Sequence, residues 1–148
     1  MDSVINLHFS VRPDQGEPSG FDLGDIICSG DQGTAGSAGH TPDQGMMIYI
    51  AVADLLYGVK ALLAGRRKRF DFVGTDSSFW LVFRQVKGGV SVAAQTGVIT
   101  RATHPGLTRE LLSAAESLEC HGVRQLPEHD AAKQDYFDAL NAFRALAA

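Results

Sequence analysis

Glycine recurs at every third position over residues 30–39, within the segment SGDQGTAGSAGHTPDQG that runs from Ser29 to Gly45. A glycine-rich loop that leads into a helix could hold a phosphate, because free N–H groups at a helix N-terminus attract anions. The segment has no Gly-Lys-Ser/Thr, its spacing is GxxGxxG instead of GxGxxG, and Asp31 and Asp43 would repel a phosphate. We therefore expect a flexible loop. An alternative function stays open: a small-ligand or nucleotide-binding domain, or an enzyme, that uses residues 30–41.

The histidines and cysteines lack the spacing that catalysis or metal binding would need. Cys120 and His121 are adjacent, so on a helix their side chains point about 100° apart and cannot pair as nucleophile and base. The five histidines occur singly, without CxxC or HxxxH spacing. We expect no catalytic residue, no metal site and no cofactor. Cys28 and Cys120 are expected to be reduced thiols of a cytoplasmic protein.

Length and composition indicate one globular domain over residues 1–148. Apolar residues make up 45% of the chain and charged residues 20%, which is typical of a folded globular protein. Asp54, Gly58 and Lys60 interrupt the most apolar segment, so we expect no membrane span. The first residues, MDSVINLHFS, have neither the basic start nor the apolar core of a signal peptide, which favours a cytoplasmic location.

Charge is distributed in blocks along the chain. Residues 1–45 hold seven acidic side chains and one arginine, a net charge of −6. Residues 46–109 hold nine basic and three acidic side chains, a net charge of +6, and residues 110–148 return to −4. Such blocks indicate the kind of partner more than the fold. An acidic first segment disfavours nucleic acid and favours a partner with a basic surface.

The first half of the chain predicts two strands and a long helix. Residues 4–12 alternate between apolar and polar side chains, as a half-buried strand does, and residues 21–28 form a second strand that could pair with the first as a hairpin. Residues 41–65 read as one helix that is apolar on two sides, with Thr41 as its cap, Pro42 at its first position and Gln44 completing a capping box. Gly65 is expected to end this helix.

The second half predicts a meander of four strands over residues 69–102, followed by two helices. The first of these helices is expected to begin at Thr108 and to run to about Cys120, and the last to cover residues 130–147. The order of elements predicts an α+β fold. We expect a mostly antiparallel twisted sheet of five to six strands, with one long central helix and two C-terminal helices packed chiefly on one face.

In its layout the chain resembles the small immunity proteins that accompany bacterial toxins. The resemblance covers most of the chain, including the central meander FVGTDSSFWLVFRQVKGGVSV, and carries no diagnostic motif. It implies a non-enzymatic protein that binds and neutralises a cognate toxin, with acidic side chains set against the toxin's basic active-site cleft, such as that of a nuclease-type toxin. No functional residue is carried over from the resemblance.

The acidic first segment supplies the residues that we predict to contact such a partner. They are Asp14, Glu17, Asp22, Asp25, Asp31 and Asp43. A homodimer is a further alternative, in which the second apolar side of the long helix pairs with its own copy. Neither nucleic acid nor membrane is expected as a partner.

Overall fold

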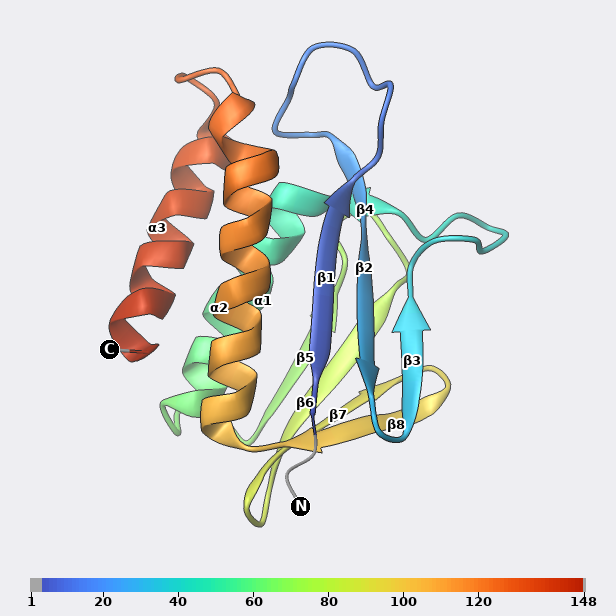
Figure 1. Ribbon diagram of the computed structural model, residues 1–148, viewed down its shortest axis with the longest axis vertical. Helices are drawn as coiled ribbons and strands as arrows, with labels where there is room; N and C mark the ends of the chain where they lie inside the picture. The colour runs from blue at the N-terminus through green and yellow to red at the C-terminus, as the bar shows by residue number, and fades with distance from the viewer. Residues whose placement is uncertain (1–3, 148) are drawn as a thin grey trace.

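The computed structural model describes residues 4–147 and shows two antiparallel sheets and three α-helices (Figure 1). The first sheet consists of β1 (Asn6–Val11), β2 (Leu23–Gly30), β3 (Gly33–Gly36) and β4 (Met46–Met47). The second sheet consists of β5 (Arg69–Val73), β6 (Trp80–Val86), β7 (Gly89–Ala94) and β8 (Gly97–Ala102). The helices are α1 (Ile48–Leu63), α2 (His104–His121) and α3 (Ala131–Ala147), with a 3-10 turn, η1, at Val123–Gln125.

The α+β class, the antiparallel pairing and the three helices are as predicted, but a single sheet of five to six strands is wrong. The second edge of β2 is occupied by β3 and β4, so no free edge remains on β2 for strands of the meander. The β2–β3 hairpin instead touches β8 at its tip, where Gln32 N–H donates to the carbonyl of Ile99 at 2.9 Å. The four-stranded meander itself is confirmed, in the order β5-β6-β7-β8.

The glycine-rich segment forms a strand, so the prediction of a flexible loop is wrong over Gly33–Gly36. Asp31 and Gln32 make the turn between β2 and β3, with Gly30 paired to Gly33. A Cβ atom on Gly30 would collide with the side chain of Thr100 in β8. Glycine therefore serves close packing between the two sheets here.

Helix α1 begins at Ile48, seven residues after the predicted Thr41. The predicted capping box is wrong, because β4 intervenes and its N-cap Met47 makes no side-chain cap bond. Backbone groups from elsewhere satisfy the first N–H groups: Met47 donates to the Thr75 carbonyl at 3.1 Å and Ile48 to the Asp22 carbonyl at 3.2 Å. The other end is as expected, since the chain leaves the helix through Gly65 at φ 80°.

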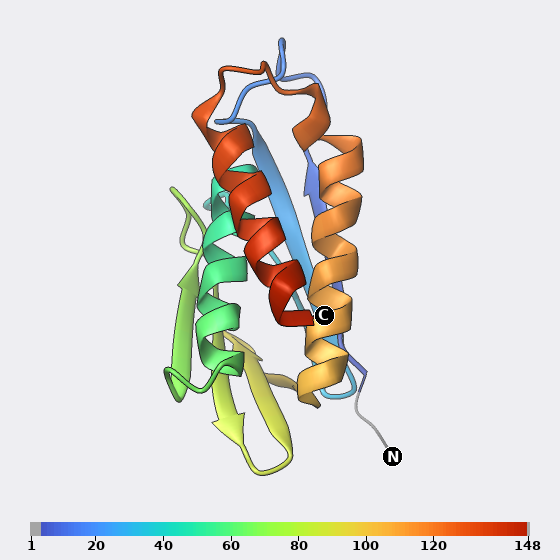
Figure 2. The same ribbon diagram turned by 90° about the vertical axis from the view of Figure 1, so that its left-hand side faces the viewer.

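Both sheets and α3 surround α1, which is the centre of the core (Figure 2). One of the two predicted apolar sides is confirmed as core, because five of its side chains at helical spacing are fully buried: Ile48, Val52, Leu55, Val59 and Leu62. Tyr49 packs edge-on against Tyr136 of α3, with ring centroids 6.5 Å apart. Tyr57, on the other apolar side of the helix, is 47% exposed.

Helix α2 begins at His104, capped by Thr103, whose Oγ1 accepts from Gly106 N–H at 3.0 Å. The predicted start at Thr108 is wrong, because His104-Pro105-Gly106 forms the first turn of the helix. Proline is well suited to the first helical turn. The helix lies along β1, where the Glu110 carboxylate accepts the backbone N–H of Leu7 at 3.0 Å.

Candidate binding surfaces

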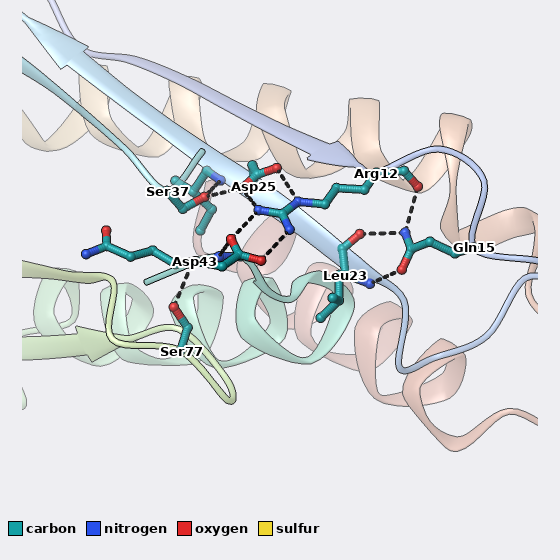
Figure 3. Close-up of polar contacts among 10 residues, drawn as sticks. Arg12, Gln15, Leu23, Asp25, Ser37, Asp43 and Ser77 are labelled. Carbon is teal, nitrogen blue, oxygen red and sulfur yellow. Dashed lines mark hydrogen bonds and ion pairs between the residues drawn. The ribbon is translucent and has the colours of Figure 1, made fainter. Parts of the chain in front are cut away.

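Arg12, just after β1, is held by two of the acidic residues predicted as partner contacts (Figure 3). Its Nε and one terminal nitrogen donate to both oxygens of Asp25 at 2.9 and 3.0 Å. Its terminal nitrogens also donate to both oxygens of Asp43 at 2.7 and 2.8 Å. A guanidinium matches a carboxylate in this paired geometry, so the contacts fix position as well as charge.

Ser37, in the chain between β3 and β4, also binds Asp25. We call Arg12, Asp25, Ser37 and Asp43 together the Arg12 centre. Its fully buried hydroxyl donates to Asp25 at 2.7 Å and accepts the N–H of Ile26 at 3.0 Å. The hydrogen bonds from Arg12 are the main cause that lowers the pKa of the Asp25 carboxyl, against the opposing effect of burial. The same arginine is the main cause that lowers the pKa of Asp43. The centre therefore anchors residues 37–43 to the first sheet as a set of charged, mutually satisfied groups.

The structure separates the six predicted contact residues. Asp14 and Glu17 are exposed in the β1–β2 loop, and Asp22 accepts the N–H of Ser19 at 3.1 Å in that loop. Asp31 lies at the far end of the first sheet, in the β2–β3 turn, and accepts the Thr100 hydroxyl at 2.8 Å (Figure 1). The fold thus brings only Asp25 and Asp43 together, on Arg12, and it uses four of the six carboxylates in bonds within the chain.

The glycine-rich segment also forms one wall of a cleft of about 310 Å³, which we call the Trp80 cleft. The facing wall comes from the start of β6 and the β7–β8 turn. The lining residues are all formally uncharged: Thr34, Ala35, Gly36, Ala38, His40, Gln44, Ser78, Phe79, Trp80, Ala94, Gln95 and Thr96. A phosphate would find no cation in this lining, whereas apolar or neutral polar groups would fit it.

The nucleotide alternative depends on residues 30–41, but the glycine-rich residues 30–36 within this range do not lead into a helix. They turn at one end of the first sheet, whereas α1 begins near the other end, after β4 (Figure 1). His40 points back to the same segment, because its Nε2 donates to the Gly36 carbonyl at 2.7 Å. The geometry that would attract a phosphate, glycine backbone next to a helix N-terminus, is therefore not formed by this segment.

The second sheet has one face against α1, while no helix within residues 4–147 covers the other face, which we call the outer face (Figure 2). Alternation along β6 decides which side chains lie on it, since Leu81 and Phe83 are buried. The outer-face residues are Arg69, Asp71, Val73, Trp80, Val82, Arg84, Ser91, Ala93, Val98 and Arg101. Trp80 belongs to both surfaces, so the cleft and the outer face meet at this residue.

Apolar side chains are exposed where these two surfaces meet. Val73 is 56% exposed and lies directly opposite Trp80, which is 36% exposed. Val98, opposite Ala93, is 39% exposed. Sequence patterning missed this surface, because residues 79–83 are all apolar and their pattern does not show which face of the strand stays exposed. The signal in the sequence is the placement of the only tryptophan next to the Ser77-Ser78 turn.

Within residues 4–147, no three His, Cys, Asp or Glu side chains lie together as metal ligands would. Over the same residues, no helix is both long enough and apolar enough to cross a membrane. Comparison with protein families, with curated proteins and with solved structures finds no match.

Proposed function

We propose that this protein acts by binding another protein, without catalysing a reaction, and that the partner docks around Trp80. The observation that carries the proposal is the exposure of Trp80 and Val73 at the junction of a cleft and an uncovered sheet face. Tryptophan is enriched among the residues that dominate binding energy, especially when apolar neighbours exclude water around it.

The rigidity of its support favours Trp80 as an anchor. It begins a strand that is paired on both sides in the second sheet, and its neighbours Phe79 and Leu81 are buried. Across the cleft, Asp25 and Ser37 fix the chain that carries the opposite wall. Both walls are therefore held in place before a partner arrives, which reduces the ordering cost of association.

The most specific form of the proposal is an immunity protein that neutralises a cognate toxin, and the layout resemblance supports it. In this form, contact through Asp14, Glu17, Asp22, Asp25, Asp31 and Asp43 stays a prediction. We place the principal contact on the Trp80 cleft instead, because four of those carboxylates already accept bonds within the chain.

Co-purification with the product of the neighbouring reading frame tests the immunity form. We expect a complex at micromolar concentration, and Trp80→Ala should weaken it at least about tenfold, the effect of losing a central aromatic anchor. Val4→Ala is the control, because Val4 is 63% exposed just before β1 and lies outside both surfaces and outside the six predicted acidic contacts. Its complex should keep the wild-type affinity.

Two results would count against the proposal. The absence of a complex at micromolar concentration would show that the immunity form is wrong. Equal losses of affinity in both variants would show that Trp80 is not the docking centre. Light scattering of the isolated protein addresses self-association. If the protein is a dimer and Trp80→Ala dissociates it, the partner that docks at Trp80 is a second copy of this chain.

A further inference from the structure

Three arginines form a row across the outer face of the second sheet. Arg69 of β5 lies opposite Arg84 of β6, Arg84 lies opposite Ser91 of β7, and Ser91 lies opposite Arg101 of β8. All three arginines are exposed. Because neighbouring strands lie about 4.8 Å apart, the first two are adjacent and the third is roughly 10 Å from the second.

Within the part of the chain that the structure describes, the positive charge of the row is compensated only in part. Like charges directly opposite one another destabilise a sheet, and Arg69 and Arg84 are such a pair. Asp71 offsets part of this charge, because its carboxylate accepts from Arg69 Nε at 2.8 Å. Among residues 4–147, no carboxylate forms an ion pair with Arg84 or Arg101. A net-acidic chain thus keeps a concentrated positive row on the face that carries no helix.

The row and the apolar junction lie at opposite ends of the same face. Trp80 and Arg84 project from one side of β6 and are four residues apart, which corresponds to about 13 Å along a strand. Val82 lies between them, next to Ala93 of β7. The outer face is therefore apolar at one end and cationic at the other.

We infer that the outer face recognises an acidic protein segment, which sets carboxylates against Arg84 and Arg101 and an apolar side chain against Trp80. The inference rests on the proposed function and adds one acidic segment of the partner to it, separate from the basic surface that the predicted contacts of Asp14 and Glu17 require. Paired carboxylate–guanidinium bonds would neutralise the row, and the apolar contact would anchor the segment. Single-stranded nucleic acid fits less well, because the outer face has one aromatic for base stacking and Asp71 would repel phosphates.

A direct binding assay uses Trp80 as its reporter, since it is the only tryptophan in the chain. The probe is a short synthetic peptide with leucines at one end and glutamates at the other, separated by about four residues to match the spacing of the face. Its controls are a scrambled peptide of the same composition and a short oligothymidine. We expect the designed peptide to change Trp80 fluorescence at the lowest concentration of the three.

Charge reversal then locates the contact. Arg84→Glu and Arg101→Glu should each weaken binding of the designed peptide by about tenfold or more, and added salt should weaken it in the wild type. Arg124→Glu makes the same change in net charge at an exposed position in η1, and it should leave the affinity within about twofold.

Several outcomes would overturn the inference. Equal losses of peptide affinity in Arg84→Glu and Arg124→Glu would show that only net charge matters. Equal binding of the scrambled peptide would show that the outer face does not recognise the spacing between leucines and glutamates. Tighter binding of oligothymidine would assign the row to nucleic acid. The reading-frame complex separates the two proposals: if Trp80→Ala weakens it and Arg84→Glu does not, the docking surface stands and the acidic partner is wrong. If Trp80→Ala has no effect there, the proposed function is wrong.

Discussion

Gly58 of α1 lies directly against the aromatic ring of Phe70 in β5. A Cβ atom on this glycine would overlap three atoms of the ring. The same ring stacks on Phe83 of β6, with centroids 6.0 Å apart, so it has little freedom to withdraw. The central helix thus approaches the second sheet at a position where the helix has no side chain.

We expect Gly58→Ala to destabilise the protein, although alanine is favoured over glycine in a helix by about 1 kcal/mol. Overpacking against Phe70 costs about 1–3 kcal/mol, so it should outweigh that gain and leave a net loss of up to about 2 kcal/mol in the free energy of unfolding. Urea denaturation measures the difference. The double variant with Phe70→Leu should be less destabilised than the sum of the two single variants, because leucine vacates the ring positions. If Gly58→Ala is more stable than the wild type, the Phe70 ring can move enough to accommodate a Cβ atom at position 58.

Asp25→Asn should cost more stability than Asp43→Asn, although both carboxylates bind the same arginine. The Asp25 side chain is 12% exposed and also accepts from Ser37, whereas the Asp43 side chain is 58% exposed. Loss of the more buried charge weakens the bonds of the half-buried Arg12 and of the buried Ser37 hydroxyl, at a cost of about 1.5–3 kcal/mol. Exposed pairs contribute little, so the Asp43 variant should stay close to the wild type. Equal losses in the midpoint of urea unfolding would contradict this ranking.

The Arg12 centre also predicts loss of stability in acid. The folded protein holds the pKa of the Asp25 carboxyl below its usual value, which is about 3.9 in an unfolded chain. Its contribution is therefore fully present above pH of about 4 and disappears as the pH falls through the lower pKa of the folded state. Thermal melts between pH 6 and about pH 2 measure this loss. Arg12→Gln should be less stable at neutral pH, and its deficit should shrink in acid; a deficit independent of pH would exclude this linkage.

The two cysteines should differ sharply in reactivity. Cys28 is fully buried in β2, and burial raises the pKa of its thiol to about 12, whereas Cys120 is exposed on α2. A thiolate is the reactive form, so Ellman's reagent at mildly alkaline pH should label Cys120 alone in the native protein. Cys120→Ser should react only after denaturant is added. Fast labelling of native Cys120→Ser would mean that the first sheet opens on the time scale of the assay.

Local patterns predicted those elements whose burial depends on neighbours along the chain. The alternation over residues 4–12 correctly placed Leu7 and Phe9 in the core, and helical spacing did the same for Val52 and Leu55. Gly65 ended the long helix as its capping preference predicts. In these cases the local periodicity and the tertiary environment require the same side chains to be buried.

The errors arose where long-range contacts replaced local ones. Thr41 and Gln44 form a capping pattern, but Met47 pairs with Leu23 and draws the chain into β4 before the helix starts. We predicted that the acidic residues form one surface because they are close in sequence. In the structure, two of them form ion pairs with Arg12. The row of Arg69, Arg84 and Arg101 has no sequence signature, since only strand register aligns them.

Glu110 has a consequence for how concentrated solutions of this protein should behave. Strand β1 is an edge of the first sheet, and such an edge offers unpaired backbone groups to any other chain in an extended conformation. Glu110 occupies one of these groups at Leu7, and α2 lies along the strand. The helix thereby hinders edge-to-edge pairing of two molecules through β1, so concentrated solutions should not aggregate by that route.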